Sequence, residues 1–215
     1  MKPPFSGLYP NHTMGRRGEA KGDVRMNPLP HMEREESVLI IVDVQELLMK
    51  QMDQEVGETV IRNICTLITF AKKMSIPILV TEQYPKGLGK TVSKIKIELG
   101  PVLPIILPIE KVSFSCCGAE LFNLQLNQLA RRQVILTGIE THVCVLQTAN
   151  DLLQKGYETH IVADAICSRR KMDLEIGLKW MEKRGAMIST TEIIAFQLLK
   201  EAGTEEFREL SKLLK

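Results

Sequence analysis

Three residues far apart in the chain carry side chains that together could perform nucleophilic catalysis: Asp43, Lys111 and Cys144. A thiolate attacks carbonyl carbon, a carboxylate can take the thiol proton, and an ammonium lowers the pKa of a neighbouring thiol and fixes a neighbouring carboxylate. Each residue alone also has an ordinary explanation, as a capping carboxylate, a solvated lysine or a small buried cysteine. The hypothesis of a cysteine nucleophile therefore depends on the fold bringing the three side chains together.

Cys144 lies where the sequence predicts the start of a helix. The turn 138–143 separates it from the apolar run 134–137, and Thr141 is a candidate N-cap residue. The free amides and the dipole of a first helical turn favour a thiolate, so we expect the pKa of the Cys144 thiol to be lowered. The same amides could stabilise the oxyanion formed when a thiolate attacks a carbonyl group.

Buried-strand patterns alternate with amphipathic-helix patterns along the chain. Strands are predicted over 38–42, 78–80, 134–137, 160–163 and 187–190, and helices over 56–68, 121–132, 143–155 and 172–184, before a helical C-terminus. This order predicts an α/β fold, a three-layer α/β/α sandwich with a mostly parallel, Rossmann-like central sheet. Ligands bind beyond the carboxyl ends of such strands. Asp43 directly follows one predicted strand, and the stretch before Lys111 approaches the same edge.

The first 36 residues differ in composition from the rest of the chain. They are rich in proline, glycine and charge and lack a hydrophobic period. We therefore expect residues 1–36 to form a disordered or loosely packed extension and residues 37–215 to form one folded domain. The net charge of +2 is too small to indicate a nucleic-acid or membrane partner. No apolar run approaches the roughly 20 residues that cross a bilayer.

The cysteines indicate a reducing compartment. The chain has five, with no CxxC pair, and is large enough to fold without disulfides. Adjacent Cys116 and Cys117 could be redox-sensitive, although simple packing is favoured. The N-terminus lacks the apolar core of a signal peptide, and its early arginines are interrupted by acidic residues and prolines. We expect a cytoplasmic protein, with mitochondrial targeting as the alternative.

Three segments resemble, in order and spacing, the signatures of the isochorismatase-like cysteine hydrolases. They are Leu39–Gln45 (LIIVDVQ), Glu110-Lys111 and Gly138–Val145 (GIETHVCV). Two further segments, Val80–Gly89 (VTEQYPKGLG) and Glu140–Ala149 (ETHVCVLQTA), are similar to the subgroup of isochorismatase domain-containing proteins. The likeness covers the chain from about residue 38 to its end.

The resemblance implies a triad of Asp43, Lys111 and Cys144. Asp43 would take the thiol proton, Lys111 would hold the charges together, and Cys144 would attack an amide-like carbonyl to give a thioester that water then hydrolyses. It also implies a cis peptide bond between Ile139 and Glu140, and an oxyanion hole formed by the backbone amides of Glu140 and Cys144.

The resemblance leaves the substrate open beyond a small molecule with an amide-type C–N bond. Pocket residues are expected among Gln45, Gln83, Tyr84 and Phe114. Relatives are commonly oligomeric, so a homo-oligomer is expected as well.

No metal or cofactor is expected. Nicotinamidases of this superfamily build a metal site from an aspartate and several histidines after the second strand. The chain has four histidines, His12, His31, His142 and His160, and none of them lies in the loop directly after Val80. We cannot assemble the three or more converging ligands that a zinc or iron site needs. A papain-like pair would have to use His160, which nothing in its local sequence supports.

Two alternatives stay open, a catalytically idle protein that keeps the hydrolase fold to bind partners, and a redox-sensing thiol protein. A thiol-reactive probe titrated against pH separates the hydrolase from the binding protein, because Cys144 of a hydrolase should label as a thiolate well below pH 8.5, the ordinary pKa of a thiol. Labelling like that of an ordinary thiol would favour the binding protein.

Overall fold

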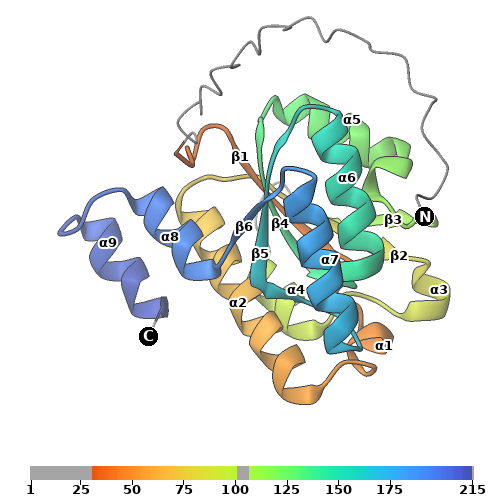
Figure 1. The fold of residues 1–215 in the computed structure, drawn as a ribbon. Helices are drawn as coiled ribbons and strands as arrows, with labels where there is room; N and C mark the ends of the chain where they lie inside the picture. The colour runs from red at the N-terminus through yellow and green to blue at the C-terminus, as the bar shows by residue number, and fades with distance from the viewer. Residues whose placement is uncertain (1–30, 101–106, 215) are drawn as a thin grey trace, which may run out of the picture. The chain divides into compact units, whose positions relative to one another are not determined.

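A six-stranded parallel sheet forms the centre of the folded domain (Figure 1). The computed structural model describes residues 31–100 and 107–214. The spatial order of the strands is β3-β2-β1-β4-β5-β6. In chain order, the strands are β1 (Ser37–Val42), β2 (Ile78–Gln83), β3 (Ile109–Lys111), β4 (Gln133–Ile139), β5 (Glu158–Cys167) and β6 (Met187–Ser189).

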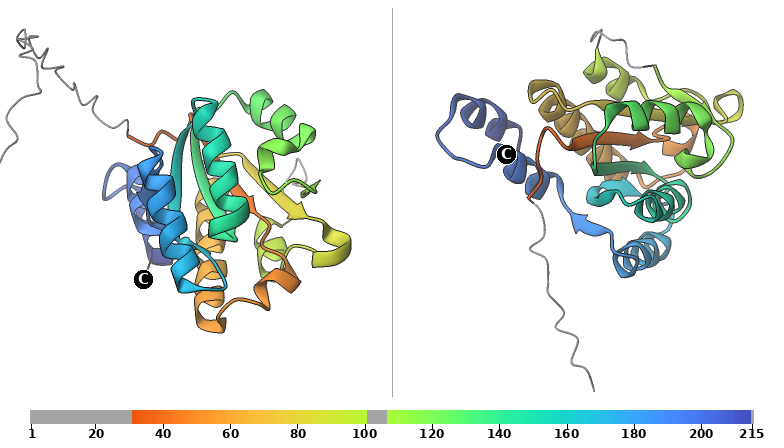
Figure 2. Two further views of the ribbon diagram at one scale, coloured as in Figure 1. Left: turned by 45° about the vertical axis from the view of Figure 1, so that its right-hand side comes forward. Right: turned by 90° about the horizontal axis from the view of Figure 1, so that it is seen from above.

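Helices cover both faces of this sheet (Figure 2). On one face the core includes residues of α2 (Gln54–Lys73), α4 (Ser93–Leu99), α8 (Thr191–Leu199) and α9 (Glu205–Leu210). On the other face it includes residues of α5 (Glu120–Leu129), α6 (Leu146–Gln154) and α7 (Lys171–Lys183). Shorter helical segments are α1 (Glu46–Met49), α3 (Pro85–Leu88), the 3₁₀ helices η1 (Cys116–Gly118) and η3 (Ser211–Leu214), and the π-helix η2 (Thr141–Val145).

The apolar run in β1 explains why this strand lies in the middle of the sheet. Successive strand side chains point to opposite faces. Leu39 and Ile41 join the core cluster under α2, whereas Val38, Ile40 and Val42 join the cluster under α5 and α6. A strand that is apolar on both faces needs helices above and below it. The predicted α/β/α sandwich with a parallel sheet is confirmed.

Several elements differ from the sequence-based prediction. Lys111 ends a strand, β3, that was not predicted from the sequence. Residues 101–106, which precede it, lie outside the described residues. The segment after β2, for which no element was predicted, contains α3 and α4. These helices have four and seven residues, too few for a periodic pattern to be detected.

Residues 31–36, which were predicted to belong to the N-terminal extension, lie within the described part of the chain. Met32 is fully buried, and its amide donates a hydrogen bond of 3.3 Å to Oε1 of Gln197 in α8. One apolar residue among polar neighbours forms no period, so the sequence could not signal this contact. The remainder of the predicted extension, residues 1–30, lies outside the described residues. Among the described helices, none combines the length and apolarity needed to cross a membrane.

Candidate active site

The carboxyl ends of β1 and β3 bring an acid and a base together in the protein interior. Asp43 directly follows β1, and Lys111 is the last residue of β3. Lys111 Nζ lies 2.6 Å from Asp43 Oδ2, and both side chains are fully buried. The two residues are separated by 68 positions in sequence, so the topology of the sheet creates this pair.

Lys111 is held by a complete set of acceptors. Besides Asp43, its ammonium donates to Oε1 of Gln83 at 2.7 Å and to the carbonyl oxygens of Ser113 and Phe114 at 3.1 and 3.0 Å. A buried charge is costly unless it is paired and hydrogen-bonded, and these contacts offset that cost. The position of the ammonium is therefore fixed relative to the carboxylate.

Asp43 is fixed in turn by Thr81 of β2. The Thr81 hydroxyl donates to Asp43 Oδ1 at 2.7 Å, and the Asp43 amide donates to the Thr81 carbonyl at 3.2 Å. The backbone φ of Asp43 is 51°, in the left-handed region that non-glycine residues seldom occupy. Such conformations gather at functional sites, where the surrounding structure has to hold them.

Cys144 is the third member of this group. It lies in η2, which follows β4 across a turn, and it is 5% exposed. Burial, followed by the negative charge of Asp43, raises the pKa of the Cys144 thiol, and Lys111 opposes this effect. The fold thus places the thiol near the carboxylate, and the carboxylate against the ammonium.

Two expectations about Cys144 are wrong. Its thiol pKa is raised rather than lowered, because desolvation outweighs the nearby ammonium. Thr141 is not an N-cap: the N-cap position of η2 is Glu140, without a side-chain hydrogen bond, and the buried hydroxyl of Thr141 has no partner among the described residues. The sequence could not show that this turn is a π-helix, which places Cys144 in the interior.

The turn before Cys144 contains two unusual backbone features. The peptide bond between Ile139 and Glu140 is cis, at the place implied by the resemblance. Gly138 has a φ of 114°, and a Cβ there would lie only 2.1 Å from the carbonyl oxygen of Val42. Only glycine allows β4 to approach the end of β1 so closely. The Glu140 side chain turns away to Arg169, whose Nε donates to Glu140 Oε2 at 3.0 Å.

The expected pocket residues divide into two kinds. Gln45 and Gln83 are buried and are used by the protein itself. Gln45 Nε2 donates to the carbonyl oxygens of Gln83 and Gly89 at 3.0 and 2.6 Å, and Gln83 positions Lys111. Their polar atoms are therefore engaged within the fold, and a role of either residue in the pocket stays a prediction. Tyr84 and Phe114 are 55% and 53% exposed, so their rings remain available for contact.

Two residues of this site were missed from the sequence. Thr81 bonds Asp43, and Cys116 is fully buried with its sulfur 3.6 Å from the Thr81 hydroxyl. Burial, followed by the charge of Asp43, raises the pKa of the Cys116 thiol to about 12. Thr81 follows a predicted strand one residue beyond its expected end. Its position beside Asp43 could have been inferred only from the pairing of β1 with β2, which the sequence does not give.

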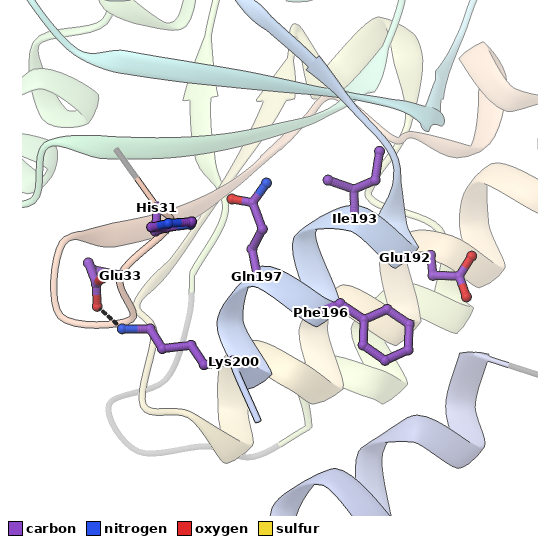
Figure 3. Close-up of a pocket in the computed structure, with 7 residues that line it drawn as sticks. All are labelled: His31, Glu33, Glu192, Ile193, Phe196, Gln197 and Lys200. Carbon is purple, nitrogen blue, oxygen red and sulfur yellow. Dashed lines mark hydrogen bonds and ion pairs between the residues drawn. The ribbon is translucent and has the colours of Figure 1, made fainter. Parts of the chain in front are cut away.

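Neither of two hollows lined by described residues includes the three candidate catalytic residues. The larger, of about 780 Å³, lies against α8 and includes the ion pair of Lys200 with Glu33 (Figure 3). The other, of about 300 Å³, lies between α6 and the end of α7. No group of three or more histidine, cysteine, aspartate or glutamate side chains within the described ranges could hold a metal ion.

Comparison with known proteins places this arrangement in a family. The model of the isochorismatase domain matches residues 37–193. The chain is 40% identical to the secreted isochorismatase effector Isc1 of Phytophthora sojae over 87% of this chain and 86% of that protein. It is 36% identical to isochorismatase domain-containing protein 2 of Xenopus laevis, over 83% of each chain.

Solved structures agree with the sequence comparison. The structure of the MAR1 ribonuclease from Caenorhabditis elegans superposes with a TM-score of 0.79 and 36% identity, over 86% of this chain and 92% of that one. The matched residues include all three candidate catalytic positions, and the resemblance inferred from the sequence is confirmed. The chain belongs to the isochorismatase family.

Proposed function

We propose that this protein is a metal-independent cysteine hydrolase that cleaves a small amide-type C–N bond through a thioester on Cys144. The observation that carries the proposal is that the buried Cys144 thiol lies near enough to the ion pair of Asp43 and Lys111 for both charges to act on its pKa. A nucleophile, a base and a group that orients the base are the elements of covalent hydrolysis. An inert packing cysteine would need neither partner.

In the first step, Cys144 Sγ attacks the carbonyl carbon while its proton moves to Asp43. Coupling the two events suits a thiol whose pKa is raised, because a free thiolate need not accumulate beforehand. The backbone amides of Glu140 and Cys144 would donate to the developing oxyanion. Before the proton transfer, Lys111 compensates for the negative charge of Asp43. After the transfer, it compensates for the negative charge of the oxyanion.

The bond to nitrogen then breaks. Asp43 gives its proton to the departing nitrogen, and an amine or ammonia leaves a thioester on Cys144. Water attacks the thioester carbon while Asp43 accepts a proton from it, and the C–S bond breaks. The carboxylic acid departs, and the proton on Asp43 returns to the sulfur, which restores both residues.

The carboxyl end of β2 supports the proposal that no metal takes part. Its donors are already engaged by the protein: Glu82 Oε1 accepts from the amide and hydroxyl of Thr91 at 2.7 and 2.8 Å, and Gln83 binds Lys111. Tyr84 completes this segment. A carboxylate so fully hydrogen-bonded would have to give up these contacts to coordinate a metal.

The proposal is tested by measuring ammonia release from a panel of small primary amides. Cys144→Ala and Asp43→Asn should each lower kcat/KM by about 10²–10⁴-fold, because each removes a group that acts in the transition state. Cys65→Ala is the matched control, since Cys65 is a half-buried thiol on α2 outside the site and its loss should leave the rate unchanged.

A short single-stranded RNA belongs in the same panel, because one similar structure is called a ribonuclease. Amide hydrolysis that persists in Cys144→Ala would refute the proposed nucleophile. A wild-type protein that turns over RNA and no amide would refute the proposed substrate class.

A further inference from the structure

One exposed row of large apolar side chains has no role in the site described above. It runs along α7 and consists of Met172, Ile176 and Trp180, which are 69%, 54% and 54% exposed. Their spacing of four residues places them along one side of the helix. We refer to these three residues as the α7 row. Trp180 is the only tryptophan of the chain.

The opposite side of α7 already has its partners, so the row cannot turn inward. Gly177 and Met181 are buried. A Cβ at Gly177 would lie 3.3 Å from Cγ2 of Thr141 and 3.4 Å from Cα of His142, so the helix is packed closely on η2. Single exposed apolar residues are ordinary, but a continuous row on a helix marks an interaction surface.

We propose that the α7 row pairs with the α7 row of a second copy of this chain, in antiparallel orientation about a two-fold axis at Ile176. The row is self-complementary in this arrangement. Ile176 meets the partner's Ile176, and Met172 meets the partner's Trp180 at both ends. Contacts of methionine sulfur with an aromatic ring are favourable, and a two-fold interface uses the same surface on both subunits.

The charges beside the row agree with the same orientation. Glu175 and Lys179 lie along the same edge of the row, before and after Ile176 in sequence. The two-fold axis therefore brings Glu175 next to the partner's Lys179, and Lys179 next to the partner's Glu175. Among the residues that the structure describes, Glu175 pairs only loosely with Lys171, at 3.9 Å between exposed side chains. Opposite charges at an interface edge favour the correct partner and register.

Sedimentation velocity of the full-length protein tests this interface. The wild type should associate in even-numbered assemblies at micromolar concentration. Ile176→Asp should raise the dissociation constant of this interface by about a hundredfold, because it buries two carboxylates at the centre of the contact. The matched control is Leu124→Asp on α5, since Leu124 is 51% exposed and lies on another helix. The control should sediment like the wild type.

The charged edge provides an independent test. Glu175→Lys and Lys179→Glu should each weaken association, and the double exchange should restore it, because the reciprocal pairs are then rebuilt with opposite polarity. Far-ultraviolet circular dichroism checks that each variant is folded. The fluorescence of Trp180 should shift to longer wavelength on dilution of the wild type.

Three results would overturn the proposal. The first is a monomeric wild type. The second is an Ile176→Asp variant that sediments like the wild type, which would leave the row to another protein or to a membrane surface. The third is a double variant, Glu175→Lys with Lys179→Glu, that associates no more strongly than either single variant. The proposal is independent of the chemistry at Cys144, so failure of one leaves the other untouched.

Discussion

Lys111 and Asp43 form the kind of buried ion pair that is poor at stabilising a fold and useful for chemistry. Removing both charges from water is costly, and a well-packed apolar pair of similar volume often serves stability equally well. Here the pair is fully buried with an N–O distance of 2.6 Å. Its value is that Asp43 stays oriented toward Cys144.

The Lys111→Met variant measures what it costs to bury the Asp43 carboxylate without its counter-charge. It leaves the Asp43 carboxylate buried without its counter-charge, so the free energy of unfolding in urea should fall by about 3–5 kcal/mol. Lys73→Met is the control, because Lys73 pairs with Glu209 on the surface, and should cost no more than about 1 kcal/mol. The double variant Asp43→Asn with Lys111→Met should recover most of the loss. If Lys111→Met lowers the free energy of unfolding no more than Lys73→Met does, the Asp43 carboxylate does not depend on Lys111 for charge compensation.

The raised pKa of the Cys144 thiol gives a second prediction, with the opposite sign to the one made from sequence. Because burial and Asp43 keep the sulfur protonated, alkylation of Cys144 by iodoacetamide should be slow at pH 7. Its rate should keep rising, about tenfold per pH unit, beyond pH 8.5, where an ordinary thiol begins to level off. Peptide mass spectrometry at each pH follows this cysteine separately. A plateau below pH 8.5 would show a free thiolate and disprove the raised pKa.

At the scale of elements, the site depends on the junction of β1 with β4. Gly138 pairs with Val42 at the end of both strands, immediately before the turn that leads to Cys144. The strands therefore fix the distance between the base and the nucleophile.

The Gly138→Ala variant tests this junction. The new Cβ would collide with the Val42 carbonyl, so we expect a loss of about 3 kcal/mol or more in unfolding free energy, together with lost activity. Gly185→Ala is a matched control: its φ is 98°, but a Cβ there meets nothing within 4 Å. It should cost only the strain of the left-handed conformation, about 1–2 kcal/mol. Equal losses would show that close approach at Gly138 is unimportant.

His160 in β5 should make the free energy of unfolding depend on pH in the acid range. Burial lowers the pKa of His160 to about 4, from an ordinary value of 6.5. Between these values the unfolded chain takes up a proton that the folded chain does not, so stability falls as the pH falls from 6.5 to 4. The loss should reach up to about 3 kcal/mol. In His160→Leu, urea denaturation across this window should show a flatter pH dependence by that amount; an unchanged slope would disprove the assignment.

The hydrophobic patterns predicted the long strands and helices well. The apolar run of β1 and the four-residue period of α2 are strong local signals. The π-helix η2 and the strand β3 are not, since they depend on packing between distant segments. For this reason Thr141 was expected to be the N-cap, whereas it is the first residue of the π-helix.

For the whole molecule, the sequence predicted which three residues come together better than it predicted their environment. Asp43 and Cys144 follow strands of a parallel sheet, so their convergence follows from topology. Burial depends on every neighbour at once, and that is why the direction of the Cys144 pKa could not be inferred. The hydrogen bonds of Gln45 and Gln83 within the fold could not be predicted, because they depend on which strands and loops lie side by side. The cytoplasmic location stays a prediction.

The most direct test of the central claim is a search for the acyl group on the protein. The wild type is mixed with an amide that it hydrolyses, quenched in acid, digested and mapped by mass spectrometry. The account predicts an acyl group on the peptide containing Cys144, removed by hydroxylamine and absent in Cys144→Ala. Turnover that proceeds without any adduct in the wild type and continues in Cys144→Ala would contradict it.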